Sequence, residues 1–286
     1  MRLVSVARFV VAIAVLTPSM PAFSEADAAA PITTVSATYP RLAAFFSDWR
    51  AFARPPVRDG VADYSPATIA RWTAALPMWR ARLAGIDRTG WPLAARDDYR
   101  LVEAELNGLD FDLRVLKPWK RDPSFYANIF ADWSDVPAHE GPSAWPNINL
   151  YEFAYPLNVA DARRLTAMLA AVSANLAAAK VNLRTSNARD LWLYGDRAFK
   201  EQSATLAALQ AGTLVMRTLD GPKPASLKGT GPKLIRAAAA AQAATDAFAL
   251  WVAAQAPSKT GPSGVGKNEY NWALLQKLGA GLICRA

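Results

Sequence analysis

Histidine and cysteine are almost absent from this chain of 286 residues, which contains one of each. A catalytic zinc ion usually has three protein ligands, and a His-Glu-x-x-His helix supplies two of them as histidines one turn apart. His139 is followed by Glu140, but Ser143 occupies the position of the second histidine. Pro137 and Pro142 also disfavour a helix through this point. The composition therefore argues against a metallopeptidase that is active by itself.

The lone cysteine, Cys284, cannot form a disulfide within the chain, so stability has to come from the hydrophobic core. A Gly-x-Ser-x-Gly nucleophile elbow is also missing, and a Ser-His-acid triad would depend on His139 alone. The net charge of +8 is spread along the sequence, without a basic patch that is interleaved with aromatic residues. We therefore predict no nucleic-acid partner.

The N-terminus combines positive charge, a short apolar core and small residues, which is typical of a secretory signal peptide. Arg2 and Arg8 precede the apolar run 9–16, which is too short to span a membrane. We predict residues 1–24 as the signal peptide and residues 25–36 as a flexible leader. No other segment is expected to reach the apolar length of a membrane span. The sequence thus predicts a periplasmic or secreted protein without membrane contact after cleavage.

Apolar residues recur at three- and four-residue steps in most of the remaining sequence, which predicts amphipathic helices. Ser65 and Pro66 mark a helix start, Pro118 marks a helix end, and Pro77 predicts a kink. The predicted fold class is all-α, an antiparallel bundle of long helices over residues 37–272, without a strand pair. The helices are expected at residues 39–54, from 65 through 83, 96–117, 158–183, 190–219 and 227–256. Their predicted inner faces are, in the same order, Leu42, Phe45, Phe46, Trp49 and Phe52; Ile69, Trp72, Leu76, Trp79 and Leu83; Tyr99, Val102, Leu106, Leu109, Leu113 and Leu116; Leu165, Leu169, Val172, Leu176, Ala179 and Leu183; Trp192, Phe199, Leu206, Leu209 and Met216; and Leu234, Ala238, Ala241, Thr245, Phe248 and Val252.

Residues 120–157 are rich in proline and tryptophan and predict an irregular segment that covers the core or lines a groove. Short helical turns are expected near residues 125–130 and 150–153. His139 and Glu140 are candidate substrate contacts in this segment, with an ordinary exposed loop histidine as the alternative.

Four aromatic side chains of the same segment form either a surface for a peptide or sugar, with Tyr151 as a candidate contact, or part of the core. They are Trp133, Trp145, Tyr151 and Tyr155. Four carboxylates of the helix at 96–117 are interpreted as a solvated or salt-bridged face instead of paired acid and base groups. They are Glu103, Glu105, Asp110 and Asp112.

Two motifs carry a resemblance to a known family. The first runs from Asn107 to Trp119 and continues in Pro-Ser-Phe-Tyr at 123–126, and the second runs from Pro262 to Trp272. With the Glu-Gly-Pro turn at 140–142 between them, the chain resembles the bacterial domain-of-unknown-function family 885 over residues 39–272. The resemblance implies an exported helical protein similar to the N-terminal half of zinc carboxypeptidases built from long helices. Zinc is then expected only in a full-length relative, whose His-Glu-x-x-His motif follows the Gly-Val-Gly-Lys segment.

The segment Gly261–Lys267 fits the phosphate-binding loop pattern, but Asn268 stands where a Ser or Thr hydroxyl should hold magnesium. That loop also follows a strand, whereas this segment follows a predicted helix, so we interpret it as a structural glycine turn. The family resemblance implies that the segment helps to line a cleft, which makes Lys267 and Tyr270 candidate contacts.

Residues 273–286 no longer resemble the family and are predicted as an atypical tail. A frameshift or early stop in a longer reading frame would produce such a tail, and a deliberately short paralogue is the alternative.

Two functional hypotheses remain. The first is a catalytically incomplete binding or scaffold module, whose partner is a peptide ligand or a missing C-terminal half and whose exposed contact face is apolar. The second is an enzyme, either a metallopeptidase completed by a separately encoded C-terminal half or a hydrolase with a site around His139. The sequence leaves the oligomeric state open.

Overall fold

The computed structural model describes residues 38–133 and 143–277. The chain divides into the two units Met1–Val35 and Ser36–Ala286, and all described residues belong to the second. The predicted signal peptide and leader, the candidate contacts His139 and Glu140, and Cys284 lie outside the described residues.

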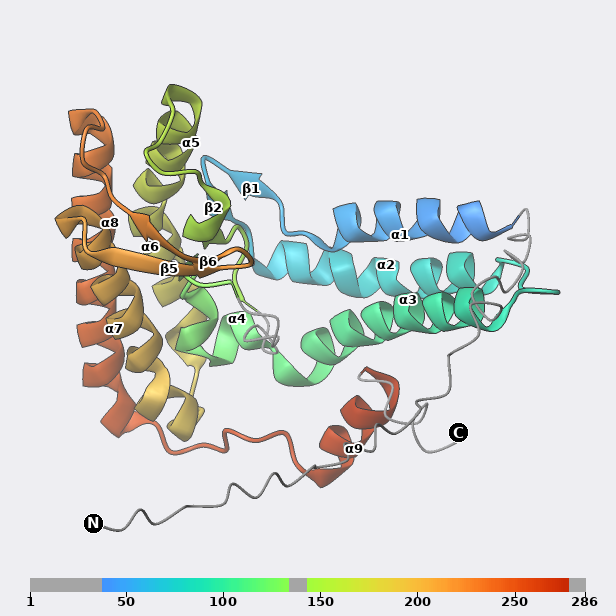
Figure 1. Ribbon diagram of the computed structural model, residues 1–286. Coiled ribbons are helices and arrows are strands. Elements are labelled where there is room, and N and C mark those ends of the chain that lie inside the picture. The colour runs from blue at the N-terminus through green and yellow to red at the C-terminus, as the bar shows by residue number, and fades with distance from the viewer. Residues whose placement is uncertain (1–37, 134–142, 278–286) are drawn as a thin grey trace, which may run out of the picture. The chain divides into compact units, whose positions relative to one another are not determined.

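Most of the described residues are helical, which confirms the predicted dominance of helix (Figure 1). Ser65 caps one helix as predicted, because its side chain accepts a hydrogen bond from the backbone N–H of Thr68. Pro77 lies inside that helix, which continues past it. The α-helices are α1 Tyr39–Ala53, α2 Pro66–Ala84, α3 Leu93–Phe111, α4 Pro118–Arg121, α5 Val159–Ala170, α6 Val172–Asn182, α7 Arg189–Ala211, α8 Pro232–Gln255 and α9 Lys267–Gln276.

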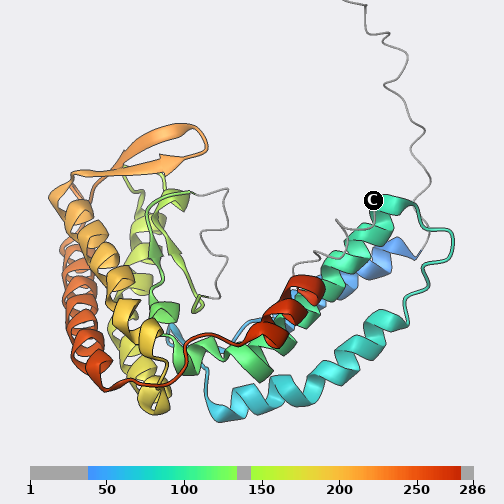
Figure 2. The ribbon, with the colours of Figure 1, turned by 90° about the horizontal axis from the view of Figure 1, so that it is seen from below.

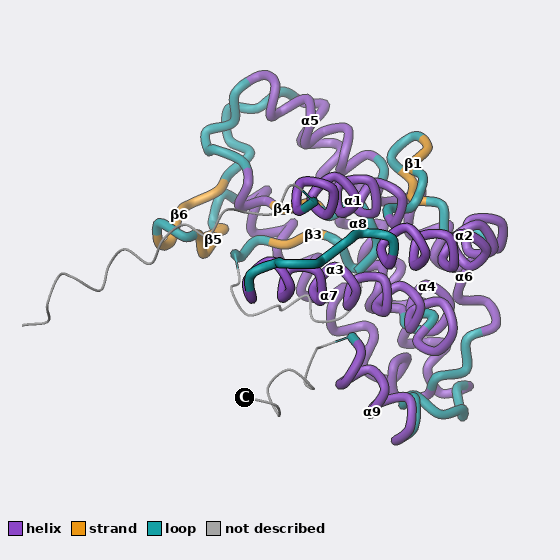
Figure 3. Tube along the Cα trace, turned by 90° about the vertical axis from the view of Figure 1, so that its right-hand side faces the viewer, coloured by secondary structure: helices purple, strands orange, loops and turns teal. Residues whose placement is uncertain are grey.

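Three short strand pairs also occur, so the prediction that no strand pair exists was wrong (Figure 3). The pairs β1–β2 and β5–β6 are antiparallel, and the pair β3–β4 is parallel. The strands are β1 Val57–Arg58, β2 Val61–Ala62, β3 Ile129–Phe130, β4 Ile148–Asn149, β5 Leu214–Thr218 and β6 Gly221–Ala225.

The helix predicted over residues 190–219 ends at Ala211, eight residues early. Gly212 has φ 74°, a left-handed conformation that terminates α7 and that glycine adopts without steric cost. The chain then enters β5, where Met216 is buried on a strand and not on the predicted helix face.

Helices α1, α2 and α3 contact one another and share one buried cluster. Trp79 packs edge-on against Phe45 and Trp49 of α1, at centroid distances of 5.5 and 5.6 Å. Most of the predicted inner faces are therefore confirmed here. The buried members of the cluster are Leu42, Phe45, Trp49, Leu76, Trp79, Leu83, Ile86, Trp91, Ala95, Tyr99, Val102 and Leu106.

Helices α5 to α8 build a second, larger cluster, in which α7 and α8 lie side by side (Figure 2). Phe199 of α7 and Phe248 of α8 are both buried, with ring centroids 4.7 Å apart. The helix predicted over residues 158–183 is divided at Ala171 into α5 and α6, but its predicted inner face is buried on both sides of the break. That face consists of Leu165, Leu169, Val172, Leu176, Ala179 and Leu183.

Two helical stretches, Val159–Thr185 and Pro232–Ser258, have the length and composition of helices that cross a membrane. On those two criteria, the expectation that no segment beyond the N-terminus reaches that apolar length was wrong, because both stretches are rich in alanine. The core helices of soluble proteins pass the same test. Leu165 and Leu169 of the first stretch and Phe248 of the second belong to one buried cluster.

Helix α3 leads into a π-helical segment, η2 Asp112–Leu116, before the chain turns at Lys117. Lys117 has φ 45°, and its N–H donates to the carbonyl of Asp112 at 2.8 Å. Pro118 follows and begins α4, so the predicted end of the long helix at this proline is confirmed.

Candidate functional site

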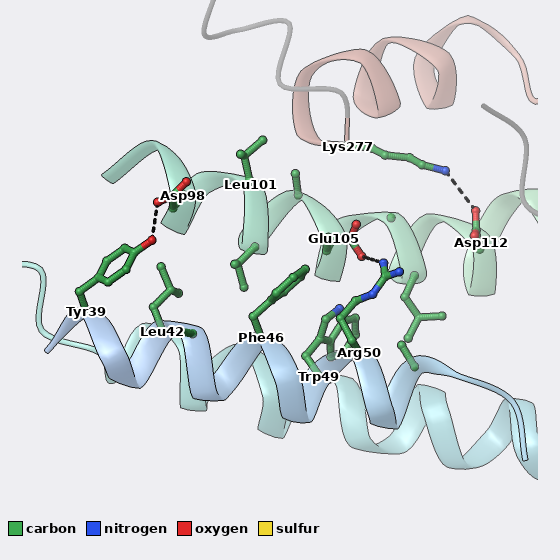
Figure 4. A pocket seen from close by; sticks show the side chains of 16 residues that line it. Tyr39, Leu42, Phe46, Trp49, Arg50, Asp98, Leu101, Glu105, Asp112 and Lys277 are labelled. Atoms are coloured by element: carbon green, nitrogen blue, oxygen red, sulfur yellow. Dashed lines mark hydrogen bonds and ion pairs between the residues drawn. The ribbon is translucent and has the colours of Figure 1, made fainter. Parts of the chain in front are cut away.

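A groove of about 880 Å³ lies between α1 and α3 (Figure 4). The two helices run in the same direction, because Tyr39 meets Asp98 near their beginnings and Arg50 meets Glu105 further along both. Apolar side chains of both helices line it: Leu42, Phe46 and Trp49 from α1, and Leu101, Val102 and Leu109 from α3. We call this surface the α1–α3 groove.

The walls of the α1–α3 groove keep large apolar side chains in contact with solvent. Leu101 is 62% exposed and Phe46 is 36% exposed, whereas their neighbours Leu42 and Trp49 are almost fully buried. Phe46 therefore does not belong to the buried face on which the sequence placed it. Exposed apolar patches of this kind mark ligand grooves or contacts between proteins.

Polar pairs stand along the α1–α3 groove and at its two ends. The Tyr39 hydroxyl donates to Asp98 at 2.7 Å, and this hydrogen bond raises the pKa of the tyrosine. Arg50 bridges to Glu105 at 3.0 Å. These groups give an otherwise apolar surface fixed points that can orient a ligand.

Helix α9 brings Lys277 to the other end of the groove. Trp272 stacks on Phe111 with centroids 5.8 Å apart, and the side-chain amide of Asn107 donates to the carbonyl of Gln276 at 3.0 Å. Lys277 Nζ then lies 3.4 Å from Asp112 Oδ1. Helix α9 was not among the predicted helices, and it runs to Gln276, past the predicted domain boundary at residue 272, and contacts α3.

Asp112→Asn is expected to change how stability depends on pH. Burial raises the pKa of Asp112, and the attraction of Lys277 opposes that shift. A carboxyl group with a raised folded-state pKa adds stability below its unfolded pKa, and that contribution is lost as the pH rises through the folded pKa. The asparagine variant should therefore gain stability relative to wild type as the pH rises through this window, in urea unfolding followed by circular dichroism.

Lys277→Met serves as the companion variant, because removal of the cation should raise the Asp112 pKa further and widen the window. A wild-type chain that instead gains on the asparagine variant with rising pH would show that the Lys277 contact outweighs burial.

The other candidate contacts do not come together. Tyr151 lies in the 3₁₀ turn Leu150–Glu152, and its ring packs edge-on against Trp133 at 5.7 Å. Lys267 and Tyr270 belong to α9, where Tyr270 is 58% exposed. Among the described residues, no hydrogen bond, ion pair or ring contact joins Tyr151 to either of them.

The described residues do not fit a zinc site. They contain no histidine or cysteine, and no group of three or more Asp or Glu side chains among them is placed to hold a metal ion. The carboxylates Glu105 and Asp110 form salt bridges with arginines, as predicted for this helix face.

The groove residue Leu101 was not singled out in the sequence. A signal for it exists, since Leu101, Ala104 and Gly108 follow at three- and four-residue steps beside the buried stripe of α3. A second apolar stripe on one helix indicates a second contact surface.

The family model described as a bacterial protein of unknown function, DUF885, matches residues 26–283. A solved structure of a "putative lipoprotein of unknown function" from Shewanella oneidensis is 16% identical to this chain, with a TM-score of 0.46. The match covers 77% of this chain and 38% of that protein, so the chain spans well under half of the relative's length. No curated protein is similar enough to this chain to count as a relative.

Proposed function

We propose that this chain, which belongs to the DUF885 family of bacterial proteins of unknown function, is an exported binding module. Its α1–α3 groove receives an amphipathic helix of another polypeptide. The observation that carries the proposal is the exposed apolar lining between two parallel helices. Export is proposed from the signal-peptide pattern of residues 1–24.

A helix suits the groove because of how α1, α2 and α3 are arranged. The three helices contact one another, and a further helix between α1 and α3 would complete a four-helix packing unit. Helices bound in this way present apolar residues at positions i, i+3, i+4 and i+7. The exposed side chains of Phe46 on α1 and Leu101 on α3 offer apolar contacts to such a helix.

Charge narrows the chemistry of the bound helix. Asp98 at one end of the groove accepts from Tyr39 but forms no ion pair within the described residues. A lysine or arginine beside the apolar stripe of the ligand would complement this carboxylate. The bound helix is therefore apolar on one face and basic near one end.

We further propose that the module is a catalytically incomplete part of a metallopeptidase-like protein, as the family resemblance implies. The bound helix then comes from a separately encoded C-terminal half or from a peptide ligand. Any zinc would be held by residues outside the described part of this chain.

Leu101→Asp is expected to weaken helix binding at least about tenfold, because it places a charge in the apolar contact. The probe is a synthetic amphipathic peptide with leucine at i, i+3, i+4 and i+7 and one flanking lysine, titrated calorimetrically into the chain from Glu25 onward. A scrambled peptide of the same composition should bind weakly or not at all.

The matched control is Leu219→Asp, which adds the same charge at a leucine that is 76% exposed between β5 and β6. It should bind the peptide like wild type. Equal binding by Leu101→Asp and wild type would refute the groove as the site. A chain that is a dimer by sedimentation, and that Leu101→Asp converts to a monomer, would make a second copy the occupant and overturn the separate polypeptide.

A further inference from the structure

A second concavity of about 610 Å³ lies where α4, the segment 185–188 before α7 and the segment before α9 meet. Four cationic side chains line it, Arg114, Lys117, Lys120 and Arg121, against the single carboxylate Glu269. We call this concavity the basic pocket. None of its residues belongs to the α1–α3 groove.

Two of the four cations lack a partner within the described part of the chain. Arg114 is held by Asp110 at 3.1 Å and lies 3.9 Å from Glu269. The exposed side chains of Lys117 and Lys120 form neither an ion pair nor a hydrogen bond there. Lys117 immediately precedes α4 and Lys120 lies within it, and both residues line the pocket. Their two charges are therefore available to a ligand.

Arg121 forms hydrogen bonds to the segment before α9, which makes up the opposite wall of the basic pocket. Its guanidinium donates to the carbonyls of Pro262 at 3.1 Å and Ser263 at 2.9 Å. Ser263 Oγ in turn accepts from the backbone N–H of Asp190 at 2.6 Å, and the N–H of Gly261 donates to the carbonyl of Asn187 at 2.8 Å. The wall is thus fixed before any ligand arrives, which lowers the entropy cost of binding.

Two backbone N–H donors come directly after Ser263 in the sequence. The N–H groups of Gly264 and Val265 form no hydrogen bond within the described residues, and both residues line the pocket. The space where a Cβ of Gly264 would lie has no atom within 4 Å. An anion can therefore approach the backbone closely at this point, as it does in other concave sites made of main-chain N–H groups.

The backbone at Lys117 is unusual for a residue with a side chain. Its φ of 45° is left-handed, and it follows the π-helical segment η2. Left-handed conformations cost free energy in residues other than glycine, and both they and π-helical turns are frequent at functional sites. A lysine at a position whose backbone conformation favours glycine is accounted for if its ammonium group has a role.

We infer that the basic pocket binds the phosphate group of a phosphate monoester. Two free ammonium groups neutralise a dianion, while the N–H groups of Gly264 and Val265 meet its oxygens. A carboxylate carries half that charge and would leave one ammonium uncompensated. The site differs from a nucleotide-binding loop, since Lys267 does not line the pocket and the segment follows helix α8 and a 3₁₀ turn.

A phosphate monoester reaches an exported protein as a free small molecule or as a lipid headgroup. The two sources are separated by titration with inorganic phosphate at constant ionic strength and by sedimentation with phosphatidylcholine vesicles, with and without phosphatidic acid. Binding of phosphate without vesicle capture identifies a free ligand, and capture only by phosphatidic acid identifies the headgroup. Binding to neither probe would overturn the inference.

The double variant Lys117→Gln and Lys120→Gln should weaken binding of the successful probe at least about tenfold. The control pair Lys228→Gln and Lys233→Gln removes the same charge at exposed lysines outside the pocket and should leave affinity unchanged. An equal loss in both pairs would show a diffuse charge effect and overturn the site.

Lys117→Gly separates charge from backbone damage. Glycine accepts φ 45° readily, so the variant should keep or raise the midpoint of thermal unfolding while phosphate binding falls. Unchanged phosphate affinity in this variant would show that the Lys117 ammonium does not contact the ligand.

Discussion

Replacement of Gln202 by leucine is expected to lower the free energy of unfolding by about 2 to 6 kcal/mol. Gln202 is 2% exposed, and its Oε1 accepts from the N–H groups of Asn128 at 2.9 Å and Ile129 at 3.1 Å. Leucine fills similar space but leaves both buried N–H groups without an acceptor, at about 1 to 3 kcal/mol each. Urea unfolding followed by circular dichroism measures the loss.

The other end of the Gln202 side chain completes a buried network between helices. Nε2 donates to Oγ1 of Thr245 at 2.9 Å, and that hydroxyl donates to the carbonyl of Ala241 at 2.8 Å. Thr245→Val should therefore cost less than Gln202→Leu, since it leaves only one side-chain donor unpaired. The network ties α7 and α8 to the irregular segment at β3.

Gln210→Leu is the matched control. This glutamine lies two turns further along α7 and is partly exposed, and its Nε2 donates to Gln242 at 2.7 Å. Water can replace that bond, so the cost should stay below about 1.5 kcal/mol. Equal losses for the two glutamines would contradict the proposed role of the buried N–H groups.

Gln202 also shows which contacts helical periodicity cannot predict. Phe199 and Leu206 were assigned to the inner face of α7, and residue 202 lies on that same face between them. The hydrophobic pattern does not predict that a glutamine in an apolar stripe is buried, because its hydrogen-bond partners belong to distant segments of the chain. The inner faces of long helices were predictable, but the polar contacts between them were not.

Of the short strand pairs, one could be predicted from local sequence and another could not. Asp59-Gly60 between Val57 and Val61 is a strong local signal for a two-residue hairpin turn, and β1–β2 could have been predicted from it. The parallel pair β3–β4 gives no local signal, because its paired residues Ile129 and Ile148 are far apart in the sequence and no tight turn can join parallel strands.

The α1–α3 groove could be predicted from the sequence only in part. Its apolar residues were visible as helix faces, but the exposure of Leu101 and Phe46 depends on which helices pack together. An amphipathic pattern states how wide an apolar face is, and only packing decides how much of it remains uncovered. For that reason the sequence predicted an apolar contact surface without its location.

Gly60→Ala is expected to lower the free energy of unfolding by about 2 to 5 kcal/mol. Gly60 has φ 78°, which costs a residue with a Cβ about 1 to 2 kcal/mol. An added Cβ would also lie 2.6 Å from the Cβ of Ala171, at the junction of α5 and α6. That methyl group is attached directly to the backbone, so relief requires the hairpin to lift. Urea unfolding at constant pH measures the effect.

Lifting the β1–β2 hairpin would also break two hydrogen bonds that hold it to α6. Asn175 Nδ2 donates to the carbonyl of Gly60 at 2.9 Å, and the N–H of Ala62 donates to Asn175 Oδ1 at 3.3 Å. Asn175→Ala alone should therefore be destabilising, and its effect should be smaller when combined with Gly60→Ala, because the shared bonds are lost only once.

Gly90→Ala separates the two causes of the Gly60 effect. Gly90 has φ 73°, but a Cβ there would have no atom within 4 Å, so this variant should lose only the backbone component of about 1 to 2 kcal/mol. Ala171→Gly in the Gly60→Ala background should recover the steric part, less the cost of glycine beside a helix. Equal losses for Gly60→Ala and Gly90→Ala, without rescue by Ala171→Gly, would show that the hairpin does not dock on Ala171. Recovery of stability by Ala171→Gly in the Gly60→Ala background, where the same change alone is not stabilising, would instead establish that the β1–β2 hairpin packs against Ala171.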